Sequence, residues 1–536
     1  MPRNRITAVL AAVVVTVLVL AGCGGGGGSD GGRTLAIADS LAPESIDPST
    51  RAGTWANVHP VLYQTLTRYP ATEADPRIIP TTADLEPALA TSWEQVEDGV
   101  IFTLDPVRSA AGNTLSAEDV VWTLQRAVAT EAPVATFLMR FAGIDLENPA
   151  EAIDATNVLV RLTGTGNPQY AAAIFQNTAM AIFDSTLVKE NVGPDDPWGA
   201  TWLATNGAPF GPYSVQAFQP GESVTLAANP NWAEAPPYSA VVVRGITDSG
   251  QRLQLVRSGQ VQLAMNMTYT DYTTATEAGL PGAQVRTFRQ DALYLDLSDP
   301  ALQDPRVRTA LSMAIDREAL IAGAYGGVAG SVPTSLFPQV YPVAEQSPVE
   351  ALSYQPDRAR ELFAEAGVTS LTLPMYLSPT ASSISADAQS TAVFLRDQLS
   401  AVGVDVTINS VATSSQFDGG FRSGDVVEFE SWLFTQMAIA PDGAYWLNLN
   451  YTTDSIGNYG GFSDPAVDDL IGRALAAPAG DERFALEAEA ASAIAPAMPI
   501  IPLADVASLV VAGEDLGRLT FRYGAIQYHE IGATTP

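Results

Sequence analysis

The stretch with the most side chains suited to ligand binding runs from Glu430 to Tyr451. It holds two tryptophans, two tyrosines and several amide, hydroxyl and carboxylate groups, and its sequence indicates an otherwise irregular segment. Aromatic walls with a few placed polar groups are typical of small-molecule sites. Plain packing in a core is an equally good interpretation of the two tryptophans. The candidate binding residues are Trp432, Thr435, Gln436, Asp442, Tyr445 and Trp446.

Residues for covalent catalysis are scarce. The two histidines, His59 and His529, are far apart and lack the spacing of a zinc site. A Ser-His-Asp triad would need one of them, and the G-x-S-x-G string at 27–31 lies in a glycine-rich tether that cannot form a hydrolase elbow. Paired carboxylates stay open as an alternative on spacing alone. We expect no catalytic residue, no metal and no cofactor, and therefore a binding protein.

The charge of the chain argues against one class of partner. Among 536 residues, acidic side chains outnumber basic ones 59 to 27, which gives a formal net charge of −32. Such a surface repels phosphate backbones, so nucleic acid is not an expected partner. With 47% apolar and 16% charged residues the chain is globular, and its length predicts two or three domains.

The N-terminus has the pattern of an export signal. Two arginines precede an apolar run from Ile6 to Leu20. The run ends in Leu-Ala-Gly-Cys, which resembles the lipobox of bacterial lipoproteins, where the cysteine thiol receives diacylglycerol. That residue, Cys23, is the only cysteine, so it cannot form an internal disulfide. We expect an exported protein, held by a lipid on Cys23 at the extracytoplasmic face of the cell membrane.

The elements that must position the binding residues are clearest between Asp291 and Gly330. Alternating leucines from 293 to 297 predict a strand that is buried on one face. Asp304 and Asp316 each stand where they can cap a following helix. This segment is therefore predicted to be a strand followed by two helices.

Two other segments also follow simple rules. Apolar alternation on both sides of Glu97-Asp98-Gly99 predicts a hairpin, and Ser116 with Asp119 predicts a capped helix. Later, a strand at 371–377, a helix to about Val402 and a strand at 404–408 predict a βαβ unit with parallel strands.

The run R-V-R-x-A-L-x-x-A-I-D-R-x-A-L-I at 306–321 closely resembles a hallmark of the extracytoplasmic solute-binding proteins of family 5. These are the dipeptide and oligopeptide receptors of bacterial ABC importers. Similar blocks occur at 85–106, 207–238 and 354–368, and the resemblance extends from about residue 44 to 512.

The resemblance implies an α/β, two-lobed periplasmic-binding-protein-like fold, type II and cluster C-like, with an extra subdomain in lobe one. Its expected parts are a lipoprotein signal peptide (1–23), a flexible Gly-rich tether (24–33), lobe one (34–289, with the subdomain at about 58–200), lobe two (290–495) and a return to lobe one (496–536).

The resemblance also implies roles for candidate residues. In peptide-binding members the binding stretch reads W-x-x-D, and the acid pairs with the α-ammonium group of the ligand. Trp432 matches the tryptophan, but Thr435 fills the position of the acid. Either Asp442 supplies the charge from the adjacent turn or the ligand carries no ammonium group. Trp55 lies in a loop that faces the cleft in the family.

The implied function is capture of a peptide or peptide-like solute between the lobes of a monomeric receptor, followed by delivery to an ABC permease with its ATPase subunits. Scarce histidine disfavours nickel, whereas an oligosaccharide would suit aromatic walls and neutral polar groups. An alternative from another class is a lipoprotein that keeps the scaffold but binds a protein and acts in regulation of the cell envelope.

Overall fold

The computed structural model describes residues 32–50, 57–72, 80–164, 166–377, 388–411, 429–437, 440–522 and 525–531. From Arg33 onward the chain forms one compact unit. The expected signal peptide, with Cys23, and the loop residue Trp55 lie outside the described residues. Of the helices in the described ranges, none has both the length and the apolar character that crossing a bilayer requires.

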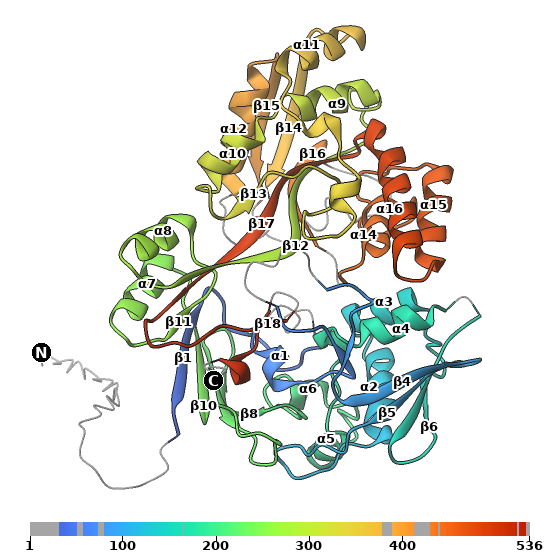
Figure 1. Ribbon diagram of the computed structural model, residues 1–536, viewed down its shortest axis with the longest axis vertical. Coiled ribbons are helices and arrows are strands. Elements are labelled where there is room, and N and C mark those ends of the chain that lie inside the picture. The colour runs from blue at the N-terminus through green and yellow to red at the C-terminus, as the bar shows by residue number, and fades with distance from the viewer. Residues whose placement is uncertain are drawn as a thin grey trace, which may run out of the picture. The chain divides into compact units, whose positions relative to one another are not determined.

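A mixed sheet of 11 strands runs through this unit (Figure 1). Strands β14 and β15 are parallel, as the βαβ prediction requires, and β16 is parallel to β14. In spatial order the strands are β15 (Val404–Ser410), β14 (Leu371–Leu377), β16 (Ser431–Met437), β12 (Gly282–Leu295), β17 (Ile500–Ala512), β11 (Leu263–Ala264), β1 (Thr34–Asp39), β10 (Ala240–Gly245), β9 (Ser223–Ala228) and β8 (Tyr213–Gln219), with β13 (Gly330–Ser331) beside β17.

Two long strands, β12 and β17, belong to both lobes. The first part of β12, up to Arg286, pairs with the end of β17 next to β11 and β1. Its second part, from Gln290, pairs with the start of β17 next to β16. The register shifts between Arg286 and Gln290, and such an irregularity bends a strand pair locally. The expected boundary between lobe one and lobe two, at 289/290, lies next to this shift in the sequence and stays a prediction.

Helices cover the sheet in lobe two, and their starts follow the sequence signals. Asp304 accepts a hydrogen bond from the Arg306 amide, and Asp316 accepts one from the Ala319 amide, which confirms both predicted caps. The helices of lobe two are α9 (Pro305–Met313), α10 (Arg317–Ala324), α11 (Pro356–Glu365), α12 (Ala388–Ser400), α14 (Gly443–Tyr451), α15 (Pro465–Ala476) and α16 (Asp481–Ile494).

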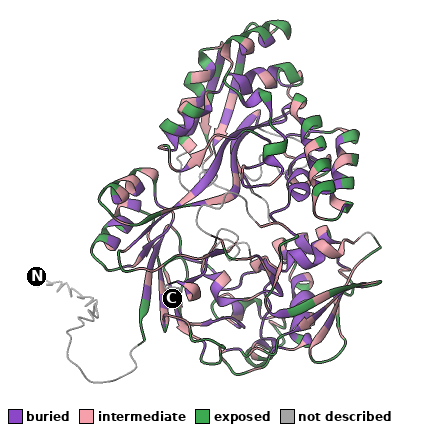
Figure 2. Ribbon diagram, viewed as in Figure 1, coloured by how far each residue is buried: buried purple, intermediate pink, exposed green. Residues whose placement is uncertain are grey.

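Lobe one contains a subdomain with its own sheet and its own buried core, visible in Figure 2. The predicted hairpin forms at Gly99, whose φ of +155° suits glycine, and Ser116 with Asp119 forms the predicted capping box. The subdomain comprises β4 (Ala90–Val96), β5 (Gly99–Leu104), β6 (Ala150–Ala152), β7 (Asn157–Arg161), α2 (Ala117–Ala129), α3 (Pro133–Ala142) and α4 (Pro168–Ile174).

Shorter elements complete lobe one. They are α1 (His59–Leu62), α5 (Ser185–Asn191), α6 (Ala200–Leu203), α7 (Ser249–Arg257), α8 (Tyr269–Glu277) and the two-residue strands β2 (Thr67–Arg68), β3 (Glu86–Pro87), β18 (Phe521–Arg522) and β19 (Ala525–Ile526).

Candidate ligand-binding site

The segment from Glu430 to Tyr451 is more regular than its sequence suggests. Residues Ser431–Met437 form β16, and Gly443–Tyr451 form α14. The helix begins where it does because the Asp442 carboxylate accepts a hydrogen bond from the Tyr445 amide at 3.0 Å. The expectation of an irregular stretch was therefore wrong for these residues, since β16 pairs with strands far away in the sequence and α14 has both a local cap and a distant partner, Glu487.

Trp432 lies in an aromatic cluster inside lobe two. Its side chain is fully buried, and its ring stacks on Tyr294 of the neighbouring strand with centroids 5.5 Å apart. Phe434 and Tyr459 meet the Tyr294 ring at 5.7 and 6.0 Å. In this state the Trp432 ring supports the sheet beside the proposed site, and a direct role toward a ligand stays a prediction.

Gln436 belongs to a row of buried polar side chains across three strands. It lies opposite Gln290, and Gln290 donates from Nε2 to Asp505 Oδ1 at 2.8 Å. Gln436 donates to Asn450 of α14 over a longer distance of 3.4 Å. Burial raises the pKa of Asp505 to about 7. The row therefore places neutral amides and one protonatable carboxyl group on the face of the sheet that α14 covers.

Thr435 points to the opposite face of the sheet and binds an acid there. Its hydroxyl donates to Asp291 Oδ1 at 2.6 Å, and the Tyr325 hydroxyl donates to Oδ2 at 2.6 Å. Burial raises the pKa of Asp291 to about 6. A carboxyl group is thus present one strand away from the position where the resemblance implies an acid and the sequence has threonine.

Asp442 is held by four protein donors, two on each carboxylate oxygen. Oδ1 accepts from the Tyr445 amide and from the Tyr170 hydroxyl at 2.7 Å. Oδ2 accepts from Arg483 Nη1 at 2.8 Å and from the Thr82 hydroxyl at 3.0 Å. A carboxylate offers about four acceptor positions, so in this state Asp442 has none left for a ligand. Its proposed role as a substitute acid would require these contacts to break.

Tyr445 and Trp446 point away from each other on α14, and both are fully buried. The Tyr445 ring meets Phe141 of lobe one edge to face, with centroids 4.5 Å apart. The Trp446 indole donates to the Leu336 carbonyl at 3.0 Å and lies 5.8 Å from the Tyr341 ring. Trp446 therefore anchors α14 within lobe two, whereas Tyr445 faces lobe one.

The start of α14 also rests on a second acid, Glu487 of α16. Glu487 Oε1 accepts a hydrogen bond from the Ala444 amide at 2.8 Å. Burial and the nearby Asp442 carboxylate raise the pKa of Glu487 well above its usual value. A Cβ atom at Gly443 would lie 2.4 Å from Glu487 Oε2, so a larger residue at the start of α14 would displace the Glu487 carboxylate.

The two histidines lie in separate environments. His59 is buried with Nε2 3.1 Å from the Ser45 carbonyl, and burial lowers the pKa of His529 to about 4. Within the described ranges, no group of three histidine, cysteine or acidic side chains is arranged to hold a metal ion.

The structure thus divides the candidates between two places. β16 carries Trp432, Thr435 and Gln436, and the start of α14 carries Asp442, Tyr445 and Trp446. The sequence analysis missed Asp291 and Arg483. Asp291 stands just before the leucines that predict the strand, and only the register of β12 against β16 shows that it faces Thr435. Arg483 gave no signal in the sequence analysis.

Comparison with known proteins gives one family and a consistent set of relatives. The family described as "Bacterial extracellular solute-binding proteins, family 5 Middle" matches residues 84–458, well over half of the chain. The "Probable di/tripeptide-binding protein 5" of Pseudomonas aeruginosa is 24% identical over 458 residues, which cover 80% of this chain and 83% of that protein. The "Probable D,D-dipeptide-binding periplasmic protein DdpA" of Escherichia coli is 25% identical over 461 residues, 82% of each chain.

Solved structures show the same fold. The ABC transporter-associated periplasmic binding protein DppA from Helicobacter pylori, in complex with the peptide STSA, superimposes with a TM-score of 0.73 at 21% identity and covers 90% of this chain and 94% of its own. HbpA2 from Haemophilus parasuis gives a TM-score of 0.76 at 19% identity, with 93% and 99% covered. The predicted two-lobed, type II periplasmic-binding-protein fold is confirmed.

Proposed function

Because this chain belongs to the bacterial extracellular solute-binding proteins of family 5, we propose that it captures a peptide or peptide-like solute between its lobes and delivers it to the permease of an ABC importer. Relatives named as dipeptide- and tripeptide-binding proteins match over about four fifths of the chain. The two lobes are joined by β12 and β17, which suits rotation about these strands.

The observation that carries the peptide proposal is the Asp291–Thr435 contact. A free peptide N-terminus is a cation, and a buried carboxyl group is its natural partner. Asp291 is only 8% exposed and lies 2.6 Å from Thr435, the residue at the acid position of the resembled motif. Asp291 therefore supplies a negative charge from β12 close to the place where Thr435 supplies none.

The proposed mechanism contains no covalent step. The solute contacts both lobes in the closed state and only one in the open state, so binding favours closure. To turn a mostly open population into a mostly closed one, a ligand must prefer the closed state by about 5 kcal/mol. A hydrogen bond from the solute to Asp291 would contribute to that difference.

We also propose that the protein is exported and anchored by lipid on Cys23. The support is the arrangement of an apolar run, small residues and a single cysteine, followed by five glycines. A lipid at that residue would place the compact unit outside the membrane on a flexible tether.

Thermal unfolding with a ligand panel tests the peptide proposal. Dipeptides to tetrapeptides with a free N-terminus should raise the melting temperature in proportion to RT ln(1 + [L]/Kd), about 2.7 kcal/mol at roughly 100 times Kd. N-acetylated peptides of the same sequence are the matched control and should stabilise far less if an acid binds the ammonium group. Equal stabilisation by free and acetylated peptides would remove the role of Asp291, and stabilisation by oligosaccharides alone would replace the peptide by a sugar.

A second candidate function is supported by the occupied Asp442 carboxylate. All of its acceptor positions are taken by protein groups, which leaves the face around Asp442 closed to a small solute in this state. A scaffold that binds a protein in the cell envelope would keep such contacts permanently. In the thermal experiment such a scaffold should respond to no small molecule in the panel.

A further inference from the structure

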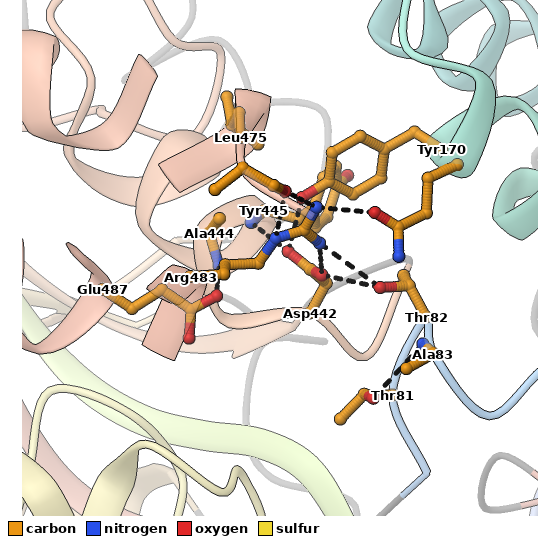
Figure 3. A network of polar contacts seen from close by, with 12 residues as sticks. Thr81, Thr82, Ala83, Tyr170, Asp442, Ala444, Tyr445, Leu475, Arg483 and Glu487 are labelled. Carbon is orange, nitrogen blue, oxygen red and sulfur yellow. Dashed lines mark hydrogen bonds and ion pairs between the residues drawn. The ribbon is translucent and has the colours of Figure 1, made fainter. Parts of the chain in front are cut away.

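Lobe one and lobe two touch through helices as well as through the shared strands. On lobe two, Asp442 at the start of α14 and Arg483 on α16 form an ion pair with Nη1 and Oδ2 2.8 Å apart. The two side chains are only 3% and 1% exposed. The groups that cover them come from lobe one, namely from α4 and from the loop before β3 (Figure 3).

Four side-chain hydrogen bonds connect lobe one to this ion pair, and the longest runs from Arg483 Nη1 to the Thr82 hydroxyl oxygen at 3.4 Å. The Tyr170 and Thr82 hydroxyl groups each donate to one oxygen of Asp442, at 2.7 and 3.0 Å. In the other direction, Arg483 Nη2 donates to Gln169 Oε1 at 2.7 Å. Both members of the ion pair are therefore completed by the opposite lobe.

Further contacts surround these bonds. Asn167, which caps α4 with its side-chain oxygen, donates from Nδ2 to the Leu475 carbonyl of lobe two at 2.9 Å. The Arg483 guanidinium lies 5.2 Å from the centre of the Tyr170 ring. Phe141 packs against Tyr170 at 4.9 Å and against Tyr445 at 4.5 Å. These rings keep water from the polar bonds, which strengthens their electrostatic part.

When the lobes open, some of these interactions persist and others break. Asp442 and Arg483 belong to the same lobe and remain paired when the lobes rotate apart. Their bonds to Thr82, Gln169 and Tyr170 would be lost. Taking an ion pair out of water is costly unless its remaining donors and acceptors are satisfied, and lobe one satisfies them only while the lobes touch.

We propose that these residues form a latch, which holds the lobes together before any solute binds. Its lobe-one side consists of Thr82, Asn167, Gln169 and Tyr170. Its lobe-two side consists of Asp442, Leu475 and Arg483. The unliganded protein then populates the closed form through its own contacts. The solute then needs to supply only the part of the free-energy difference between the closed and open states that the protein's own contacts do not supply. The latch does not depend on the nature of the solute, so it stands apart from the peptide proposal.

Hydrogen exchange of the full-length, unliganded protein tests the latch. Tyr170→Phe removes the hydroxyl that binds Asp442 but keeps the ring. Loss of one hydrogen bond to a charged group should raise the open population by roughly 10- to 100-fold. Amide exchange in peptides covering 440–451 and 166–174 should quicken by that factor, because exchange through opening follows the open population. Peptides from β12 and β17 should be unchanged, which shows that the variant is folded.

Tyr213→Phe is the matched control. Tyr213 is also buried in lobe one with one hydrogen bond, from its hydroxyl to the Tyr238 carbonyl at 3.1 Å, but it lies outside the latch. The Tyr213→Phe variant should show the same amide exchange rates at 440–451 as the unaltered protein. If Tyr170→Phe loses protection in β12 as well, Thr82→Val decides in its place.

Two results would overturn the latch. One is rapid exchange at 440–451 and 166–174 in the unaltered protein, since the lobes would then already be apart. The other is exchange in folded Tyr170→Phe or Thr82→Val that equals that of the unaltered protein, since the hydrogen bonds would then not hold the lobes together.

Discussion

At the scale of single residues, burial decides the charge of two acids on the shared strands. Asp291 on β12 and Asp505 on β17 both have a pKa raised by burial, to about 6 and about 7. Each accepts hydrogen bonds, from the Thr435 and Tyr325 hydroxyl groups in one case and from the Gln290 side chain and the Gln339 backbone amide in the other. These acids therefore change charge close to neutral pH.

Asp505→Asn should remove the contribution of Asp505 to the pH dependence of the free energy of unfolding. The pKa of an aspartate in an unfolded chain is about 3.9, whereas burial raises that of folded Asp505 to about 7. The folded protein holds this proton more tightly, so the free energy of unfolding should fall as pH rises from about 4 to about 7, by as much as about 4 kcal/mol. The variant should lack that fall and be more stable than the unaltered protein at pH 8.

Urea unfolding between pH 4 and 8 measures this difference. Gln290 can turn its amide toward the new side chain, since its Oε1 finds no partner among the described residues. Asp469→Asn, at an acid that is 70% exposed, changes the net charge equally and serves as the control. Parallel curves for Asp505→Asn and the unaltered protein would show that Asp505 is ionised throughout.

The candidate site could be predicted only in part from the sequence. The residue types of the stretch point to Trp432, Thr435 and Gln436, and the structure places all three on one strand. The partner of Thr435 is Asp291, 144 residues away, and a contact of that kind depends on strand register. Sequence patterns fix which face of a strand is apolar, but they do not show which strands are neighbours.

At the scale of elements, the sequence predicted helices and strands correctly where residues close together in the sequence determine them. The caps at Asp304 and Asp316, the capping box at Ser116 and the parallel βαβ unit all form as predicted. The failure was the segment 430–451, where β16 is held by strands on both sides and α14 by a cap and by distant partners. In that segment, contacts with residues far away in the sequence determine the secondary structure, and the local sequence pattern is too weak to predict it.

The N-terminal segment is the element on which the proposed lipid anchor depends. Cys23→Ser keeps the apolar run and the tether but removes the thiol that would carry the lipid. Variant chains from which the apolar run has been cleaved should leave the membrane fraction after export, because the remaining tether offers no other apolar anchor. Fractionation of cells followed by detection of the protein measures this. Gly25→Ala keeps the thiol and should remain with the membrane, whereas retention of Cys23→Ser after a salt wash would contradict the lipid anchor.

At the scale of the whole molecule, two different links connect the lobes. β12 and β17 join them covalently and carry a register shift between Arg286 and Gln290. The helices α4, α14 and α16 join them through side chains around Asp442 and Arg483. A receptor needs the first link to survive opening and the second to be broken and remade. The structure has both kinds of link, and we expect the lobes to rotate about β12 and β17.

Native mass spectrometry of the protein purified gently from its own cells tests the central claim most directly. A receptor for a peptide or peptide-like solute should appear partly as a complex, heavier than the bare chain by the mass of a short peptide, and fragmentation should release that solute. Washing with mild denaturant and refolding should remove the extra mass. A bare chain that neither carries nor regains any solute when incubated with a cell extract would contradict the account.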